Sequence, residues 1–153
     1  MTDTGPLLRV ADRGDVDAVR AVVTAAYEPW IPVIGKRPVP MEADYDQLIE
    51  AGRVTVLLPQ GSGPIAAIIV LVLEPQGLLI ENVAVDPAFQ GRGFGGILLA
   101  HAEDVAKSAG RGSVRLYTHP LMASNIALYE HLGYLITTGD THEEQPVHLT
   151  KSL

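Results

Sequence analysis

Short stretches of alternating or unbroken hydrophobic residues occur along most of the chain and predict β-strands. They cover residues 7–11, 53–58, 65–73, 78–85, 113–117, 134–137 and 146–149. Turns rich in Gly and Pro separate the strands between residues 53 and 85, so the middle of the chain predicts an antiparallel meander. The last two stretches predict a hairpin with an acidic loop over residues 139–145.

Helical periodicity, with apolar residues three or four positions apart, occupies the sequence between these strands. It predicts helices over residues 16–26, 41–50, 97–109 and 124–132, the first of them capped by Asp15. The third helix connects two of the strands, and such a crossover predicts that these strands are parallel neighbours. The pattern as a whole predicts an α/β fold in a single domain over residues 1–153.

The segment over residues 27–40 interrupts this pattern. Its prolines, Pro29, Pro32, Pro38 and Pro40, exclude a continuous helix and predict a long, ordered loop. Loops of this length in compact domains often carry function. Tyr27 and Trp30 offer rigid apolar faces there and are candidates for binding the body of a substrate, the alternative being that Trp30 covers the core.

Composition and charge narrow the class of protein. The chain has 153 residues, 47% of them hydrophobic, which is enough to bury a core and argues against disorder. It has no cysteine, which excludes disulfides and thiolate metal sites. A net charge of −7 disfavours nucleic acid and favours a cationic partner. The apolar runs are too short to span a membrane and no signal pattern opens the chain, so we expect a cytoplasmic protein without membrane contact.

The most informative stretch is residues 83–96, where a strand ends at Asp86 and a helix follows a turn crowded with glycines. Glycines allow positive φ and a close approach of the backbone to a ligand. The free N–H groups and the positive dipole end of the following helix favour a negative group. This stretch therefore predicts an anion-binding loop, most simply one for phosphate.

Two other phosphate loops have to be considered. Gly91, Gly93 and Gly96 satisfy the dinucleotide fingerprint G-x-G-x-x-G between a strand and a helix. The fingerprint also needs an acidic residue at the end of the next strand, where this chain has Thr118 and His119. An antiparallel meander conflicts with the parallel sheet of that fold, and no Gly-Lys-Ser/Thr follows to make a Walker loop.

Two motifs resemble the GNAT superfamily of N-acetyltransferases. Residues 90–95, Gln-Gly-Arg-Gly-Phe-Gly, are similar to its acyl-CoA loop, Arg/Gln-x-x-Gly-x-Gly/Ala, and Val85–Gln90 to its Val-x-Pro-x-x-Gln lead-in. Residues 122–134 resemble its Asn-x-x-x-Tyr helix followed by Gly-Phe/Tyr. The likeness covers nearly the whole chain. It implies a mixed, mostly antiparallel central sheet with helices on both faces and a splayed parallel strand pair.

The resemblance implies acetyl-CoA as co-substrate, bound without a metal. Its pyrophosphate would lie on the backbone N–H groups of the loop, and its pantetheine arm would pair with the preceding strand like another strand. The residues so implied are Val83, Ala84, Val85, Gln90, Gly91, Arg92, Gly93, Phe94, Gly95, Gly96 and Asn125. Whether the Arg92 side chain reaches a phosphate or lies in solvent is left open.

Acetyl transfer to an amine requires two proton movements, and the resemblance suggests a residue for each. Glu81 shares strand parity with Val83 and Val85 and is the candidate base, acting through a water on an ammonium acceptor. Tyr129, one helical turn after Asn125, is the candidate donor to the leaving thiolate. The alternatives are a solvent-facing Glu81 and a purely structural Tyr129.

The remaining polar residues are assigned smaller roles. The histidines lack metal-ligand spacing, with His119 the one to re-examine because it ends a strand, and Glu103 with Asp104 predicts a solvated face. The sequence thus predicts an N-acetyltransferase that moves acetyl to a primary amine of a small molecule or peptide by direct attack in a ternary complex. A homodimer is compatible with this prediction. The alternative is a non-catalytic CoA-binding module of the same fold.

Overall fold

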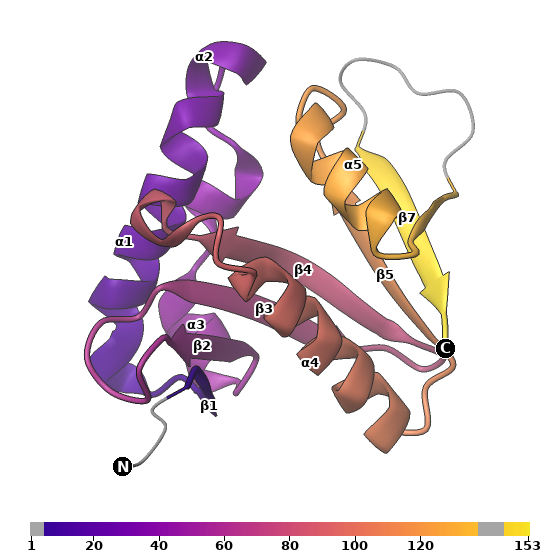
Figure 1. The fold of residues 1–153 in the computed structure, drawn as a ribbon, viewed down its shortest axis with the longest axis horizontal. Helices are drawn as coiled ribbons and strands as arrows, with labels where there is room; N and C mark the ends of the chain where they lie inside the picture. The colour runs from indigo at the N-terminus through magenta and orange to yellow at the C-terminus, as the bar shows by residue number, and fades with distance from the viewer. Residues whose placement is uncertain (1–4, 138–145) are drawn as a thin grey trace. The chain divides into compact units, whose positions relative to one another are not determined.

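A computed structural model of the chain describes residues 5–137 and 146–153. The strands are β1 (Leu7–Val10), β2 (Val54–Leu58), β3 (Ala67–Leu73), β4 (Leu78–Val85), β5 (Ser113–Thr118), β6 (Leu135–Ile136) and β7 (Val147–Ser152), most of them labelled in Figure 1. They form one sheet in the order β1-β2-β3-β4-β5-β7-β6, with β4 and β5 as its parallel pair. The helices are α1 (Val16–Tyr27), α2 (Ile31–Ile34), α3 (Tyr45–Glu50), α4 (Phe94–Ser108) and α5 (Ala123–His131). The predicted mixed, mostly antiparallel α/β fold is confirmed.

The chain forms two compact units. The first unit comprises Met1–Leu71 and Asn82–Leu98, and the second comprises Val72–Glu81 and Leu99–Leu153. β3, β4 and α4 each contribute residues to both units. The two units are described separately below.

In the first unit, β1 and β3 flank β2 in antiparallel register. All five residues of β2 are buried, as expected for a strand covered on both faces. Helix α1 packs against α3, and its buried residues Val19, Val22 and Val23 recur at helical spacing. The unit therefore has an apolar core built from the meander and the first helix.

In the second unit, β4 pairs in parallel with β5 through Leu78–Val114 and Ile80–Leu116. β7 lies antiparallel to β5 on its other side, and β6 pairs with β7. Arg115 forms a bidentate ion pair with Glu74 at 2.7 Å for both contacts, which joins β5 to the turn before β4. The predicted parallel crossover and the final hairpin are confirmed.

The prediction of a loop over residues 27–40 was wrong. After α1 the chain forms a 3₁₀ helix, η2 (Glu28–Trp30), then α2, and after a turn another 3₁₀ helix, η3 (Val39–Glu42). Pro29, Pro32 and Pro40 each lie within the first two positions of one of these short helices. The backbone N–H groups at these positions have no partner within the helix, so a proline there does not prevent the helical turn.

The starts of α3 and α4 differ from prediction, and so does the role of Asp15. Asp15 stands at the cap position of α1, as predicted, but its carboxylate accepts no bond from α1. It pairs with Arg9 at 2.6 and 2.9 Å and accepts the Asp12 N–H at 2.8 Å in the capping box of the preceding 3₁₀ helix (Arg13–Asp15). This pairing lowers the pKa of Asp15. α3 begins at Tyr45 with Asp44 as its cap, and α4 begins at Phe94, three residues earlier than its apolar pattern predicted. None of the helices in the described residues is long and apolar enough to cross a membrane.

Candidate active site

The glycine-rich turn after β4 has backbone angles that only glycine adopts easily. Gly91 and Gly93 have φ angles of +82° and +79°, where a side chain would strain the backbone. A 3₁₀ helix, η4 (Pro87–Phe89), leads into the turn and is capped by the carboxylate of Asp86. Helix α4 follows directly at Phe94, whose ring is buried and anchors the start of the helix. The predicted turn from strand to helix is present.

The space in front of these glycines is open. A Cβ added to Gly91, Gly93 or Gly96 would meet no atom within 4 Å, and one on Gly95 would only touch Val85 at 3.9 Å. The first N–H groups of α4 have no partner within their own helix, because no preceding turn supplies a carbonyl. Such a turn can receive a phosphate group closely, so the chain offers a fitting cradle for the pyrophosphate of a coenzyme.

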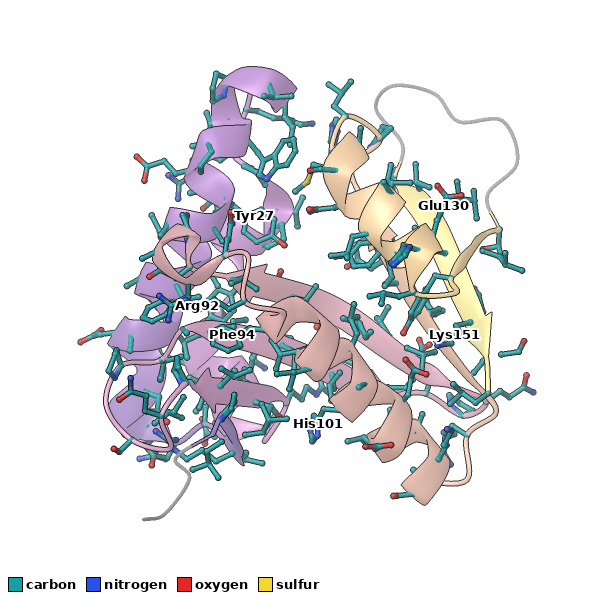
Figure 2. The ribbon with its side chains drawn as sticks, viewed as in Figure 1. Tyr27, Arg92, Phe94, His101, Glu130 and Lys151 are labelled. Carbon is teal, nitrogen blue, oxygen red and sulfur yellow. The ribbon has the colours of Figure 1, made fainter. Side chains whose placement is uncertain are left out.

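Arg92 and Gln90 lie at the exposed edge of this turn. The guanidinium of Arg92, which Figure 2 labels, lies over the Phe89 ring, 5.3 Å from its centroid. The Gln90 amide lies 3.5 Å from the carbonyl of Val85 and so ties the turn back to the end of β4. Both side chains are held by the protein at the rim of the cradle.

Along β4 buried and half-buried residues alternate strictly. Glu81, Val83 and Val85 fall on the half-buried side, as their parity predicted, while Asn82 and Ala84 are buried on the opposite side. A carboxylate therefore shares a strand face with the residues predicted to hold the pantetheine arm.

In the second unit Glu81 lies near Tyr117, an aromatic residue to which no role was assigned from the sequence. The negative charge of Glu81 adds to burial in raising the pKa of Tyr117 on β5. Tyr117 pairs with His148 on β7, and the two ring centroids are 5.7 Å apart. Three titratable side chains thus come from adjacent strands. His119, singled out for its place at a strand end, accepts a hydrogen bond from the Leu121 amide at 3.1 Å.

Helix α5 carries Asn125 and Tyr129 four residues apart, so they lie on one helix face. Asn125 is half-buried and Tyr129 is 6% exposed. Burial raises the pKa of Tyr129 above the ordinary tyrosine value, which keeps its phenol protonated. Among the residues that the structure describes, none forms a hydrogen bond with this hydroxyl.

A second tyrosine lies beside it. The Tyr134 ring meets Tyr129 edge-on at 6.4 Å, and the Tyr134 hydroxyl is buried without a partner in the described part of the chain. Lys151 lies over the Tyr134 ring at 5.9 Å and forms an ion pair with Glu103 at 3.0 Å. The prediction that Glu103 belongs to a solvated face was therefore wrong, because β7 supplies a cation that helical periodicity does not reveal.

The first unit contains a buried polar network around Asn82. The Tyr27 hydroxyl donates to Asn82 Oδ1, and Asn82 Nδ2 donates to the Tyr45 hydroxyl at 3.1 Å. Tyr27 was predicted to present its ring to a substrate, yet its side chain is only 9% exposed, while Trp30 is half-buried. The one sequence signal for this network was an asparagine at a buried position of an apolar strand.

Two further predictions concern clusters of polar residues. The acidic turn with Asp140, His142, Glu143 and Glu144 lies outside the described residues. Within residues 5–137 and 146–153, no three His, Asp or Glu side chains come together in an arrangement that could hold a metal ion.

The fold, the glycine cradle and the α5 helix together match a known class of protein. The model of the acetyltransferase (GNAT) family matches residues 19–134, so the chain belongs to this family. Over 53 residues it is 45% identical to the ribosomal protein bS18-alanine N-acetyltransferase of Salmonella typhimurium, covering 35% of this chain and 36% of the relative. Over 59 residues it is 36% identical to the streptothricin acetyltransferase of Streptomyces lavendulae, covering 39% and 31%.

Solved structures agree on the fold. The PaiA N-acetyltransferase of Thermoplasma acidophilum in complex with coenzyme A superposes with a TM-score of 0.83 at 15% identity, covering 97% of this chain and 99% of that one. The Escherichia coli ribosomal-protein-S18-alanine N-acetyltransferase gives 0.69 at 20% identity, covering 96% and 93%. The matched segments span a quarter to a half of the length of the curated relatives. The family recognised from the two motifs is confirmed.

Proposed function

We propose that residues 1–153 form a single acetyl-CoA-dependent N-acetyltransferase domain, which transfers acetyl to a primary amine by direct attack in a ternary complex. The observation that carries the proposal is the open cradle at Gly91 and Gly93, which follows β4 and leads into α4. Structural neighbours of the same fold have been solved with coenzyme A. The proposal assigns the pyrophosphate to the backbone of Gln90–Gly96.

The half-buried side of β4 then receives the rest of the co-substrate. Val83, Ala84 and Val85 offer backbone groups to the pantetheine arm, and Asn125 orients it. One N–H of this strand polarises the thioester carbonyl, which makes the carbonyl carbon a better target for an amine. Arg92, already held at the rim by Phe89, supplies positive charge near the phosphates.

Glu81 is assigned as the general base. A lysine-like amine has a pKa of about 10.4 and is mostly an ammonium at neutral pH, so it must lose a proton before it attacks. The position of Glu81 on the face shared with Val83 supports this role, because the base has to lie near the reacting carbonyl. A carboxylate is a much weaker base than an amine, so a water carries the proton away from the acceptor to Glu81.

Tyr129 is assigned as the group that donates to the departing sulfur. Its burial keeps the phenol protonated, and no described protein group competes for its hydrogen. A tyrosine phenol, with a pKa of about 10, is already a weaker acid than a thiol of pKa about 8.5, and burial widens this difference, so the proton given to sulfur has to be replaced. The proton that the amine loses is available for this purpose, and the net products are an amide, a thiol and one proton.

The acceptor in the proposed reaction is an amine on a peptide or on a small molecule. Relatives and neighbours include enzymes named for a ribosomal protein alanine, for streptothricin and for a peptide complex, so both peptides and small molecules are candidates. The net charge of −7 favours a cationic acceptor. Trp30, half-buried just after α1, and Tyr27 remain our candidate contacts for its apolar part.

The test is a thiol-release assay with acetyl-CoA and a panel of amines, which includes peptides with free N-terminal alanine, lysine peptides, polyamines and amino acids. We expect at least one amine to release thiol well above the rate without acceptor, together with an acetylated product by mass spectrometry. Binding of acetyl-CoA without turnover on any amine would identify the chain as a non-catalytic CoA-binding module. Binding of NADH in place of acetyl-CoA would overturn the proposal.

A further inference from the structure

We propose that Asn82 and Tyr27 are positioning residues, which hold the backbone of β4 at Val83 in the geometry that acetyl transfer requires. The inference rests on the proposed function, because it assumes that Val83 and its neighbours bind the pantetheine arm. Neither residue touches the reacting atoms in this account. They act from the buried side of the strand, opposite the face that carries Glu81.

The contacts form one continuous chain within the first unit. The Tyr27 hydroxyl donates to Asn82 Oδ1 and also lies 3.4 Å from the carbonyl oxygen of Val83. Asn82 Nδ2 donates to the Tyr45 hydroxyl, which donates in turn to the carbonyl of Pro40 at 2.6 Å. The chain therefore runs from α1 across β4 to η3.

The hydrogen bonds can run in only one direction. The Pro40 carbonyl can only accept, so the single hydroxyl proton of Tyr45 is committed to it. Tyr45 must then accept from Asn82, which turns the amide nitrogen toward Tyr45 and the amide oxygen toward Tyr27. An ordinary apolar residue at position 82 could not join the two tyrosines, because the position needs one donor and one acceptor.

Burial makes this arrangement rigid. Tyr27, Asn82 and Tyr45 are 9%, 7% and 2% exposed, so water does not readily replace a lost partner. The Tyr27 hydroxyl proton is committed to Asn82 Oδ1, so its 3.4 Å separation from the Val83 carbonyl oxygen is a contact and not a second full hydrogen bond. The backbone at Val83 is therefore held through Asn82, which directly precedes it in the strand. A small displacement of a positioned group is enough to slow a reaction strongly.

The test compares two variants that each remove one buried hydroxyl. Tyr27→Phe removes the contact with Val83 and the anchor of Asn82, while Tyr45→Phe removes only the support on the far side. Both keep the aromatic ring, so an acceptor that touches the Tyr27 ring is still bound. We measure Tm, the Kd for acetyl-CoA by calorimetry, and kcat and KM for both substrates.

We expect similar losses of Tm in the two variants, but a fall in kcat of about 10-fold to 10²-fold only in Tyr27→Phe, with KM values little changed. Asn82→Ser, too short to reach both tyrosines, should lower kcat in the same way and decides the question if Tyr27→Phe does not fold. Equal kcat in all three variants, or losses that simply follow Tm, would overturn the positioning role. Failure of the wild-type chain to bind acetyl-CoA would overturn the proposed function as well, so the two failures are distinguishable.

Discussion

Each of the two units of this chain contains a pair of buried tyrosines, and the two pairs differ in whether their hydroxyls form hydrogen bonds. Tyr27 and Tyr45 in the first unit are joined through Asn82 by a complete chain of hydrogen bonds. Tyr129 and Tyr134 in the second unit contact each other through their rings, and the described residues offer neither hydroxyl a hydrogen bond. All four side chains are between 0% and 9% exposed, so burial does not explain the difference.

Under the proposed function, the difference separates tyrosines that support the fold from Tyr129, to which we assign a chemical role. A buried hydroxyl without a partner costs about 1–3 kcal/mol, whereas a satisfied one stabilises the fold modestly. The hydrogen bonds of Tyr27 and Tyr45 within the protein are enough to explain why these hydroxyls are buried. Among the described residues, the hydroxyl that is fully buried without a partner is that of Tyr134, whereas Tyr129 has the half-buried Asn125 beside it on the same helix face. Our proposal gives Tyr129 its hydrogen-bond partner in the departing sulfur of acetyl-CoA.

The largest effect that this comparison predicts is on turnover. Tyr129→Phe should lower kcat by roughly 10²-fold to 10⁴-fold with little change in the Kd for acetyl-CoA, because only the proton donor is lost. Tyr134→Phe is the matched control, since it removes a neighbouring buried hydroxyl at a ring distance of 6.4 Å. Steady-state kinetics on both variants measures the effect. An unchanged rate in Tyr129→Phe would show that solvent protonates the thiolate and that Tyr129 is structural.

A second prediction concerns Tyr117, the one tyrosine of the sequence outside these two pairs. Tyr117 is 36% exposed and lies near Glu81, whose charge helps to raise its pKa. Glu81→Gln should lower kcat/KM by about 10²-fold at neutral pH, because it removes the general base. It should also lower the pKa of Tyr117, because a negative charge that favours the neutral phenol is gone.

Ultraviolet titration of the phenolate checks the pKa, and the thiol-release assay checks the rate. Glu130→Gln, an exposed carboxylate on α5, is the control and should change neither quantity. If Glu81→Gln shifts the pKa of Tyr117 but leaves the rate intact, Glu81 is near the phenol without being the base.

The smallest predicted effect is on the free energy of unfolding, and removing a hydroxyl should change it differently in the two pairs. Tyr45→Phe leaves Asn82 without an acceptor and Pro40 without a donor, and should lower the free energy of unfolding by about 1–3 kcal/mol. Tyr134→Phe removes a hydroxyl that has no partner in the described residues, so it should be neutral or slightly stabilising. Denaturant titration decides, and equal losses in both variants would mean that the Tyr134 hydroxyl is bonded in solution.

Sequence alone predicted the glycine turn and α5 well, because both depend on local rules. Positive φ at Gly91 and Gly93 follows from crowded glycines, and the face shared by Asn125 and Tyr129 follows from helical spacing. The role of Asn82 could not be predicted in this way, since its partners Tyr27 and Tyr45 lie 55 and 37 residues away in the chain. Which distant residue meets a buried amide is a property of tertiary packing.

The prediction of a loop over residues 27–40 was wrong for a different reason. Proline was treated as excluding helix, although it is well tolerated in the first turn, and three short helices each begin with a proline in their first two positions. The ion pair of Glu103 with Lys151 was missed because β7 lies far along the chain from α4. In each case the local residue pattern was compatible with more than one structure.

The central claim, that the glycine turn binds acetyl-CoA, is tested most directly by calorimetry on a matched pair of variants. Gly93 and Gly110 have φ angles of +79° and +71°, and a Cβ on either would meet no atom within 4 Å. Gly93→Ala and Gly110→Ala should therefore each introduce backbone strain of about 1–2 kcal/mol and lower Tm by a similar amount. We predict that Gly93→Ala weakens acetyl-CoA binding at least about 10-fold because its Cβ blocks the approach of the pyrophosphate, while Gly110→Ala binds like the wild type. Equal affinity for acetyl-CoA in both variants would contradict the account.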